Sequence, residues 1–485
     1  MPPLRGADPS RQPATRGVRQ IPAPPTGDRL LGHQPAYVAD PLGAFRRWSA
    51  AYGEAVRLRF GPIPVLLLTS PEAAEDVLVH EATSFRKAPV IRHAARSVIG
   101  DSVFTAEGET WSRQRALLEP FLRLERTAAH LPVIVEEMTA TIARWAPGSV
   151  IETLRETMRL SQRISGRVIF GADVTDADVD RVAAALAVTD ADFQDRVDSL
   201  LLYLQPDWLP TRRAARRRRA VASLDELIYG LIDARRRRAL GGPDLLGELL
   251  LRQPEIPWLT DRLLRDNAVS LLVESREDPG LLLTWALYLL ARHPEVAGRV
   301  AAEVDAVLGD REPVAADLPR LVLIGDVLRE TLRLYPPVYS TGRQAVRDCT
   351  VAGIAVPRGT VVLLSPAVLH RDAARFPDPD AFRPDRWRAT PSASLPSGAY
   401  APFGIGPRRC LGEHLAWMIG VVGLALLLRD RRFLPADPAP VEPRILLSLR
   451  PSREVMLRVE GRHRGGRRGS MRGRPPDRMH LPVDR

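Results

Sequence analysis

The hydrophobic positions of the chain recur mainly at helical spacing. From about residue 108 to residue 335, Ala, Leu and Arg repeat with helical periodicity in segments separated by Pro or Gly, a pattern typical of amphipathic helices. The longest of these segments spans residues 261–293. A last apolar helix is predicted from Gly412 to about Arg429. The middle of the chain is therefore predicted to be almost entirely helical.

Short apolar runs with turn residues between them predict small sheets near both ends of the chain. Residues 55–70 read as two strands around a Gly-Pro turn, and further strands are expected within 338–370 and 444–459. The pattern predicts a mainly α protein with minor β-sheets. Composition divides it into a flexible N-terminal segment, 1–27, a single domain, 28–460, and a basic disordered tail, 461–485.

The formal net charge of +11 comes mostly from the two ends of the chain. Residues 461–485 carry eight Arg and two Asp, and residues 1–20 carry four Arg and one Asp, which leaves only about +2 for the rest. The Arg runs at 212–219 and 235–238 are interpreted as solvated helix faces. No basic stripe with interleaved aromatic residues is present, so no nucleic-acid partner is expected.

Cysteine content and hydropathy indicate the compartment. Two cysteines, Cys349 and Cys410, do not make a disulfide framework in so long a chain. No apolar stretch of 18 residues is present, and no apolar segment follows Met1. We therefore expect a cytoplasmic protein without a membrane span. We also expect it to be a monomer.

The segment FGIGPRRCLG, residues 403–412, carries the strongest chemical signal. Gly404 and Gly406 allow a tight turn and a close approach to a flat ligand. Cys410 precedes an apolar helix whose N-terminal amides favour a thiolate. Arg408 lies two residues earlier and can pair with a carboxylate. A lone cysteine is more often an inert buried side chain, so the spacing of the whole loop decides its interpretation.

This loop resembles the heme-binding signature of the cytochrome P-450 family, and the likeness extends from about Pro22 to Val459. It implies the cytochrome P-450 fold, with heme b held between the long central helix and the Cys410 helix. Cys410 would be the thiolate ligand of the iron, a ligand that favours O–O cleavage. The other cofactor contacts that it implies in this loop are Phe403, Gly404, Arg408 and Gly412.

Three further constellations support the resemblance. Trp111 and Arg115 are four residues apart and share a helix face. The resemblance implies that both residues bind a heme propionate. It implies the same role for Arg343. Glu330 and Arg333 are spaced to pair on one helix. The resemblance adds Arg386 as a third member, making a structural charge cluster.

The central helix departs from the family pattern. The resemblance places Glu274, Glu277 and Asp278 at distal positions, where Glu277 keeps the usual acid and Asp278 replaces the usual Thr. Glu274 and Asp278 are four residues apart and project onto one face. Two carboxyls in a pocket of low dielectric tend to share one proton.

Several functions stay open at this point. In the first, the Glu274/Asp278 pair delivers protons in a dioxygen-dependent monooxygenase that hydroxylates or epoxidises an apolar small molecule. In the second, the enzyme uses peroxide or rearranges its substrate. A third possibility bonds Glu274 covalently to the heme edge, and a fourth is a non-catalytic heme-binding protein. Electrons would come from a separate ferredoxin- or flavodoxin-type donor that docks on Arg123, Arg408 and Arg409.

Overall fold

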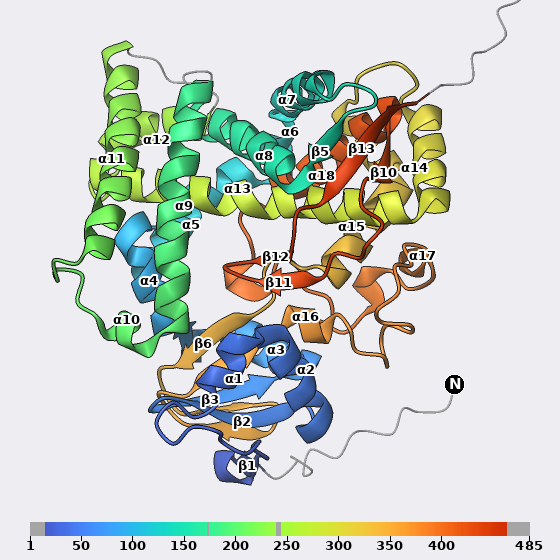
Figure 1. Ribbon diagram of the computed structural model, residues 1–485. Helices are drawn as coiled ribbons and strands as arrows, with labels where there is room; N and C mark the ends of the chain where they lie inside the picture. Colours follow the sequence, from blue (N-terminus) through green and yellow to red (C-terminus); the bar gives the residue numbers. More distant parts are fainter. Residues whose placement is uncertain (1–14, 172–173, 239–243, 463–485) are drawn as a thin grey trace, which may run out of the picture.

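The computed structural model describes residues 15–171, 174–238 and 244–462, and Figure 1 shows a helical body above a smaller β-rich lobe. The body contains most of the chain between α4 and α15, together with α18. The lobe joins strands from the first hundred residues to strands from residues 341–364. The mainly α architecture with minor sheets is the one predicted from the sequence.

The helices account for most of the described residues. They are α1 (Gln34–Ala39), α2 (Pro41–Tyr52), α3 (Pro71–Glu75), α4 (Pro89–Ile99), α5 (Gly108–Leu122), α6 (Leu124–Ala128), α7 (Leu131–Arg144), α8 (Thr153–Phe170), α9 (Asp176–Asp198), α10 (Leu200–Leu204), α11 (Arg212–Arg238), α12 (Leu245–Arg252), α13 (Asp261–Arg292), α14 (Pro294–Val307), α15 (Val322–Leu334), α16 (Pro366–Leu369), α17 (Arg386–Ala389) and α18 (Glu413–Asp430).

The strands of the described residues are short and form four small sheets. They are β1 (Arg16–Gly17), β2 (Ala55–Phe60), β3 (Ile63–Leu68), β4 (Phe85–Lys87), β5 (Val150–Glu152), β6 (Thr341–Ala345), β7 (Cys349–Val351), β8 (Ile354–Val356), β9 (Val361–Leu364), β10 (Arg431–Pro435), β11 (Pro443–Ile445), β12 (Leu449–Pro451) and β13 (Met456–Gly461). The largest sheet has the order β2-β3-β9-β6-β4, with β3 and β9 parallel.

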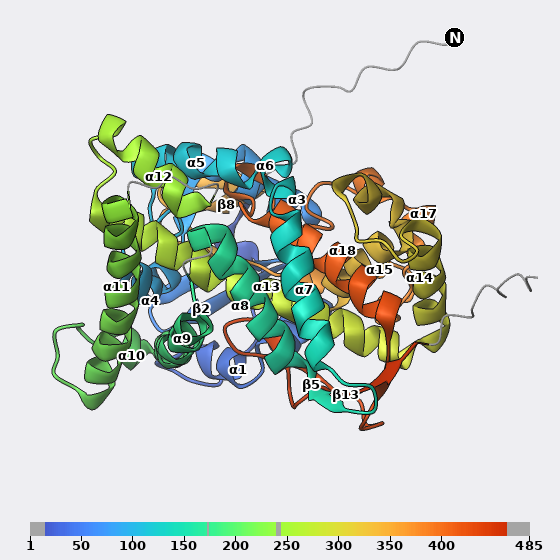
Figure 2. The same cartoon turned by 90° about the horizontal axis from the view of Figure 1, so that it is seen from above.

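Helix α13 runs through the centre of the body, and α8 packs along it (Figure 2). Pro279 lies inside α13 and lacks an N–H, so the carbonyl of Ser275 loses its usual helical donor. The hydroxyls of Ser161 and Ser165 on α8 each donate to that carbonyl at 3.0 Å. The helix therefore continues through the proline, because its neighbour satisfies the freed acceptor.

Two glycines let α18 approach the central helix closely. A Cβ on Gly420 would lie 3.3 Å from Leu282, and one on Gly423 would lie 2.9 Å from Leu283. Both leucines are fully buried in the largest apolar core. This close packing sets the separation of α13 and α18, between which the sequence places the cofactor.

Both ends of the ordered domain extend past the boundaries expected at residues 28 and 460. Residues Arg16–Gly17 pair with β8, and Ile21 is 2% exposed in an apolar cluster, although both lie within the segment 1–27 that was expected to be flexible. Most of the expected tail, 463–485, lies outside the described residues. The domain boundaries stay a prediction. Within the described ranges, no helix is both long enough and apolar enough to cross a bilayer.

Candidate heme site

The Cys410 loop is built by two glycines that no other residue could replace without strain. Gly404 and Gly406 have φ values of 72° and 73°, in the left-handed region that disfavours a side chain. A Cβ on Gly406 would also lie 1.9 Å from the carbonyl oxygen of Leu78. The amide of Cys410 closes the loop by donating to the carbonyl of Phe403 at 2.9 Å. The loop therefore holds the cysteine in one fixed orientation.

Cys410 is surrounded by protein and yet accessible. Burial raises the pKa of its thiol to about 12, and the backbone amide of Gly412 opposes the shift only in part. Charges on Glu274 and Asp278 add to the increase. The helix N-terminus thus does not by itself produce the thiolate expected from the sequence, because desolvation outweighs the amide. A metal ion bound to the sulfur would supply the missing positive charge.

An internal space separates Cys410 from α13. Cys410 and Glu274 are both exposed by their solvent-accessible surface, although burial raises the pKa of each. Because both side chains lie inside the molecule and are still accessible to solvent, they face an internal hollow and not the outer surface. Because Glu274 and Asp278 act electrostatically on Cys410, the thiol and the distal carboxyls lie across the same hollow.

One end of this hollow carries excess positive charge. Lys87 on β4 lies directly opposite Arg343 on β6, and like charges facing each other across a sheet are destabilising. Burial lowers the pKa of Lys87 to about 7, with Arg343 and Arg408 contributing, and lowers that of Arg343 to about 10, with Arg408 contributing. Arg408 pairs with Glu107, the one carboxylate that acts on all three cations. Glu274 also acts on Lys87, but not on the two arginines. The three basic groups therefore leave excess positive charge that suits the carboxylates of an anionic ligand.

Aromatic rings line the same end. The ammonium of Lys87 lies 3.2 Å from the centroid of the Phe104 ring, and the guanidinium of Arg408 lies 4.4 Å from that of Trp111. Arg115 is engaged differently: it donates to the carbonyl of Arg409 at 2.6 Å and lies 3.4 Å from Glu119 on its own helix. Trp111 and Arg408 therefore face the cationic end, whereas Arg115 braces the Cys410 loop.

Sequence reasoning missed Lys87 and Glu107. Lys87 is the single lysine in a chain whose other basic residues are Arg and His, and that was the available signal. Its pairing with Arg343 depends on β4 and β6, which are more than 250 residues apart. The backbone amide of Lys87 also donates to Glu107 at 2.9 Å.

Glu277 is tied into an ion pair. Arg450 on β12 donates to its carboxylate at 2.5 Å, and the hydroxyl of Ser448 donates at 2.7 Å. Burial acts to raise the pKa of Glu277, but these donors and the charge of Arg276 hold it below the ordinary value. Glu277 is therefore an ionised, fixed group, and no feature of the sequence pointed to Arg450 as its partner.

Asp278 is the distal carboxyl without such a partner. Burial raises its pKa to about 7, and the charges of Glu277 and Glu274 add to this, while Arg276 and Arg450 oppose it. Arg276 is itself committed to Asp190 on α9, at 2.6 Å. Near neutral pH, Asp278 can therefore both hold and release a proton.

Glu274 lies nearer the cationic end of the hollow. Its carboxylate accepts from the hydroxyl of Ser270 at 2.9 Å. Burial raises its pKa, and the charge of Lys87 opposes that increase. The predicted Glu274/Asp278 face thus forms, but the two carboxyls have different neighbours.

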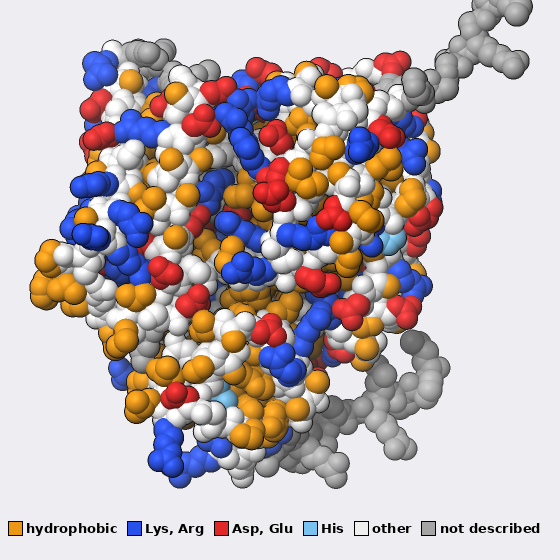
Figure 3. All heavy atoms as spheres, in the orientation of Figure 1, with side chains coloured by type: hydrophobic (Ala, Val, Ile, Leu, Met, Phe, Trp, Pro, Cys, Tyr) orange, Lys and Arg blue, Asp and Glu red, His pale blue; other side chains and the backbone are white. Residues whose placement is uncertain are grey.

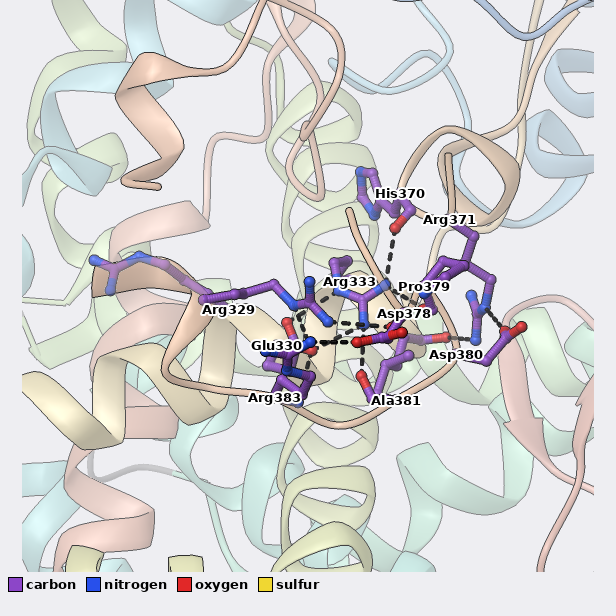
Figure 4. A network of polar contacts seen from close by, with 12 residues as sticks. Arg329, Glu330, Arg333, His370, Arg371, Asp378, Pro379, Asp380, Ala381 and Arg383 are labelled. Carbon is purple, nitrogen blue, oxygen red and sulfur yellow. Dashed lines mark hydrogen bonds and ion pairs between the residues drawn. The ribbon is translucent and has the colours of Figure 1, made fainter. Parts of the chain in front are cut away.

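The expected charge cluster around Glu330 forms between α15 and the loop 376–390 (Figure 4). Arg333 donates twice to Glu330, at 2.8 and 3.0 Å, and Arg386 donates once, at 3.0 Å. The indole of Trp387 and the amide of Arg383 complete the shell of the carboxylate. Glu330 and Arg333 are both fully buried. This cluster anchors the loop 376–390 to α15.

The residues present fit a heme. A thiol lies on one side of the hollow, a helix with small and acidic residues lies on the other, and the cationic end suits two propionates. Cys410 would hold the iron, while Lys87, Arg343, Arg408 and Trp111 would hold the carboxylates. Bound there, heme would supply the redox chemistry of an oxygenation.

Comparisons with known proteins agree with this geometry. The cytochrome P-450 family model matches residues 22–458. Cyclooctatin synthase from Streptomyces melanosporofaciens is 33% identical over 91% of this chain and 95% of its own. Cyclooctat-9-en-7-ol 5-monooxygenase from the same organism is 32% identical over 85% and 88%. The crystal structure of the cytochrome P450DA heme domain, 24% identical, covers 93% of this chain and 99% of that one with a TM-score of 0.82. The chain therefore belongs to the cytochrome P-450 family of heme-thiolate monooxygenases.

Proposed function

We propose that the protein is a dioxygen-dependent monooxygenase that hydroxylates or epoxidises an apolar, terpenoid-like small molecule, with Asp278 as the distal proton carrier. The proposal is carried by membership of the cytochrome P-450 family together with the place of Asp278 on α13, where it acts on Cys410 and where burial raises its pKa to about 7. The relatives named above include a monooxygenase that acts on an alcohol, which supports this reaction class.

Each polar residue has a separate task in this proposal. Asp278 holds a proton below about pH 7 and releases it toward the hollow. Glu277, fixed by Arg450 and Ser448, stays ionised beside Asp278, and its charge keeps the pKa of Asp278 raised. Arg343, Arg408 and Lys87 hold the carboxylates of the cofactor, and so orient it.

The first test is the carbon-monoxide difference spectrum of the dithionite-reduced protein. A strongly red-shifted Soret band is expected, and it should be lost in Cys410→Ser. An unshifted band in the wild type would contradict ligation by Cys410 and would favour a non-catalytic heme-binding protein.

Replacing Asp278 separates the monooxygenase from its main rival. The rival is a peroxide-using or rearranging enzyme, and it is favoured by the loss of the distal Thr and by the engagement of Glu277 with Arg450. With a ferredoxin, a reductase and NADPH, we expect product from the wild type and from Asp278→Thr, and much less from Asp278→Leu. Product formed only with peroxide, in every variant, would favour the rival.

A covalent bond between Glu274 and the heme edge is a further candidate. It is favoured by the accessible carboxylate of Glu274, which faces the hollow. Acidic extraction of heme from the purified protein tests it directly. Heme that is retained by the wild type and released by Glu274→Ala would support the bond, and complete extraction from the wild type would exclude it.

The electron donor is proposed to be a separate ferredoxin- or flavodoxin-type protein that docks on the Cys410 side of the molecule. Arg123 is exposed between α5 and α6, and α6 packs against α18; Arg409 is exposed beside Glu413. Arg408 is 16% exposed and is ion-paired with Glu107, so it offers less to a docking partner than Arg123 and Arg409 do, and its docking role stays a prediction. Arg123→Glu should lower the rate of reduction by ferredoxin, whereas reduction by dithionite should be unchanged.

A further inference from the structure

Two strand pairs of the described residues place like charges directly opposite each other. One consists of Lys87 and Arg343 at the cationic end of the hollow. The other consists of Arg444 and Arg450, which are paired across the hairpin of β11 and β12. Directly opposed residues of an antiparallel pair project from the same face, so each pair is destabilising unless an anion offsets the two charges. The carboxylates of the cofactor suit the first pair, and the second pair calls for another anion.

The hairpin is fixed beside the distal carboxyls. The carbonyl of Leu449 accepts from the indole of Trp285 on α13 at 3.2 Å, and the amide of Leu449 donates to the carbonyl of Pro337 at 3.0 Å. The neighbouring Arg450 acts electrostatically on Asp278. Figure 1 shows the hairpin between the helical body and the β-rich lobe, and Figure 3 shows basic and apolar side chains together at that place. The hairpin therefore presents its arginines beside the distal side of the hollow.

Both arginines keep donors that have no acceptor. Arg450 donates to Glu277 through Nε alone, and its two terminal nitrogens form no hydrogen bond within the described residues, although its side chain is only 23% exposed. In the same part of the chain, the exposed Arg444 forms no ion pair and no side-chain hydrogen bond. The nearby Arg276 is paired with Asp190. Arg444 is therefore a positive charge in excess, which one singly charged anion would balance.

Apolar side chains continue from the arginines to the turn of the hairpin. Ile445, Leu446 and Leu447 are all partly exposed. The hairpin thus offers free guanidinium donors on its strands and hydrocarbon at its turn. This combination fits a ligand that has a charged head and an apolar body.

We propose, on the basis of the monooxygenase function inferred above, that Arg444 and Arg450 bind a carboxylate of the substrate, which is therefore an apolar carboxylic acid. A guanidinium binds a carboxylate through parallel, charge-assisted hydrogen bonds. A neutral alcohol would leave the excess charge unbalanced and would bind less tightly. Burial raises the pKa of Asp278 to about 7, so below that pH this carboxyl is largely neutral and does not repel the bound anion.

The test is a titration of the ferric, heme-loaded, full-length protein, followed by the shift of the Soret band on binding. Two matched pairs of probes are used: dodecanoic acid with dodecanol, and abietic acid with abietinol. At about pH 6.5 and low salt, at least one acid should bind the wild type about tenfold or more tightly than its alcohol does. Arg444→Gln and Arg450→Lys should each lose most of this advantage. The lysine keeps a positive charge for Glu277 but lacks the forked donors.

Arg432→Gln on β10 is the matched control. Arg432 is exposed and lies directly opposite Glu460 on β13, so its loss should leave the preference for the acid unchanged. Arg444→Gln should also keep or raise the free energy of unfolding, because it relieves a like-charge pair. A merely structural arginine would instead lower the free energy of unfolding when it is replaced, and the acid and the alcohol would lose affinity together.

Three results would overturn the proposal. Neither acid could bind the wild type more tightly than its alcohol, which includes the case in which neither acid shifts the Soret band. The preference for the acid could survive in both arginine variants, which would place the carboxylate at another cation such as Lys87. Finally, Arg432→Gln could lose the preference as fully as they do. Because no electron donor is present, an acid that binds as expected but is never oxygenated in later turnover assays would count against the proposed function alone.

Discussion

Two buried charge clusters in this protein differ in whether every charged group is hydrogen-bonded to a group of opposite charge; we call the first cluster matched and the second unmatched. Around Glu330, one carboxylate accepts from two guanidiniums, an indole and a backbone amide. On α13, Glu274, Glu277 and Asp278 lie within five residues, and only Glu277 is paired with an arginine of another element at hydrogen-bonding distance. A matched buried cluster holds elements together, whereas an unmatched one leaves groups free to change protonation.

The cationic end of the hollow is the counterpart of the distal carboxyls. Lys87 and Arg343 face each other across two strands, and Glu107 offsets only part of the charge. Such an arrangement is unfavourable until an anion is bound. The hollow is therefore polarised, with excess positive charge at the edge where carboxylates would bind and excess acid on the distal side.

The largest effect is expected from breaking the matched cluster. Glu330→Gln keeps the shape of the side chain but leaves the fully buried guanidinium of Arg333 without its counterion. The free energy of unfolding should therefore fall by about 3–5 kcal/mol. Denaturant unfolding measures it, with Asp385→Asn as a control. Asp385 forms an exposed pair with Arg299, and its loss should cost about 0–1 kcal/mol. Equal effects in the two variants would contradict the distinction.

The unmatched cluster should show itself in the pH dependence of stability. The pKa of Asp278 is raised from 3.8 to about 7, so its contribution to stability is present below about pH 4 and is lost as pH rises through 7. Asp278→Asn should remove that loss, which is at most about 4 kcal/mol for a shift of this size. Unfolding at several pH values measures it.

Asp261, at the start of the same helix, provides a control of opposite sign. Hydrogen bonding to Arg236 lowers the pKa of Asp261 to about 2. The contribution of Asp261 to folding stability is present above its ordinary pKa and is lost as pH falls. Asp261→Asn should therefore lower the free energy of unfolding more at pH 7 than at pH 2. Parallel pH profiles for the two variants would show that Asp278 is not perturbed as the structure indicates.

Removing Arg450 should leave Glu277, the paired carboxylate of α13, without its ion-pair partner. In Arg450→Met, Glu277 keeps only Ser448 and the more distant Arg276, and the loss should be about 1.5–3 kcal/mol. The pKa of Glu277 should then rise, so the destabilisation should grow between pH 5 and pH 8. A pH-independent loss would indicate that Arg450 acts through packing.

The smallest change in stability is expected at the cationic end, and its sign is opposite. Lys87→Met removes an incompletely paired buried charge, so the heme-free protein should become more stable by about 1–3 kcal/mol. Heme should dissociate faster from the same variant, because one carboxylate partner is lost. Transfer of heme to apomyoglobin measures the rate. Slower dissociation, or a less stable heme-free protein, would contradict the role of Lys87.

Sequence patterns predicted the elements and the turn of the Cys410 loop well, because both depend on local spacing. The central helix, predicted at 261–293, spans Asp261–Arg292. The turn of the Cys410 loop follows from Gly404 and Gly406, which both adopt positive φ. The environment of Glu277 was not predictable, because Arg450 reaches it from a hairpin more than 170 residues away.

By itself, the sequence determined the fold class, the cysteine that is the candidate ligand and the acidic character of the distal helix, since each depends on residues close together in the chain. Only the tertiary structure decided which acid is neutralised, which cation lacks a counterion and which cysteine faces a hollow. Those outcomes depend on desolvation and on charges brought together from distant segments.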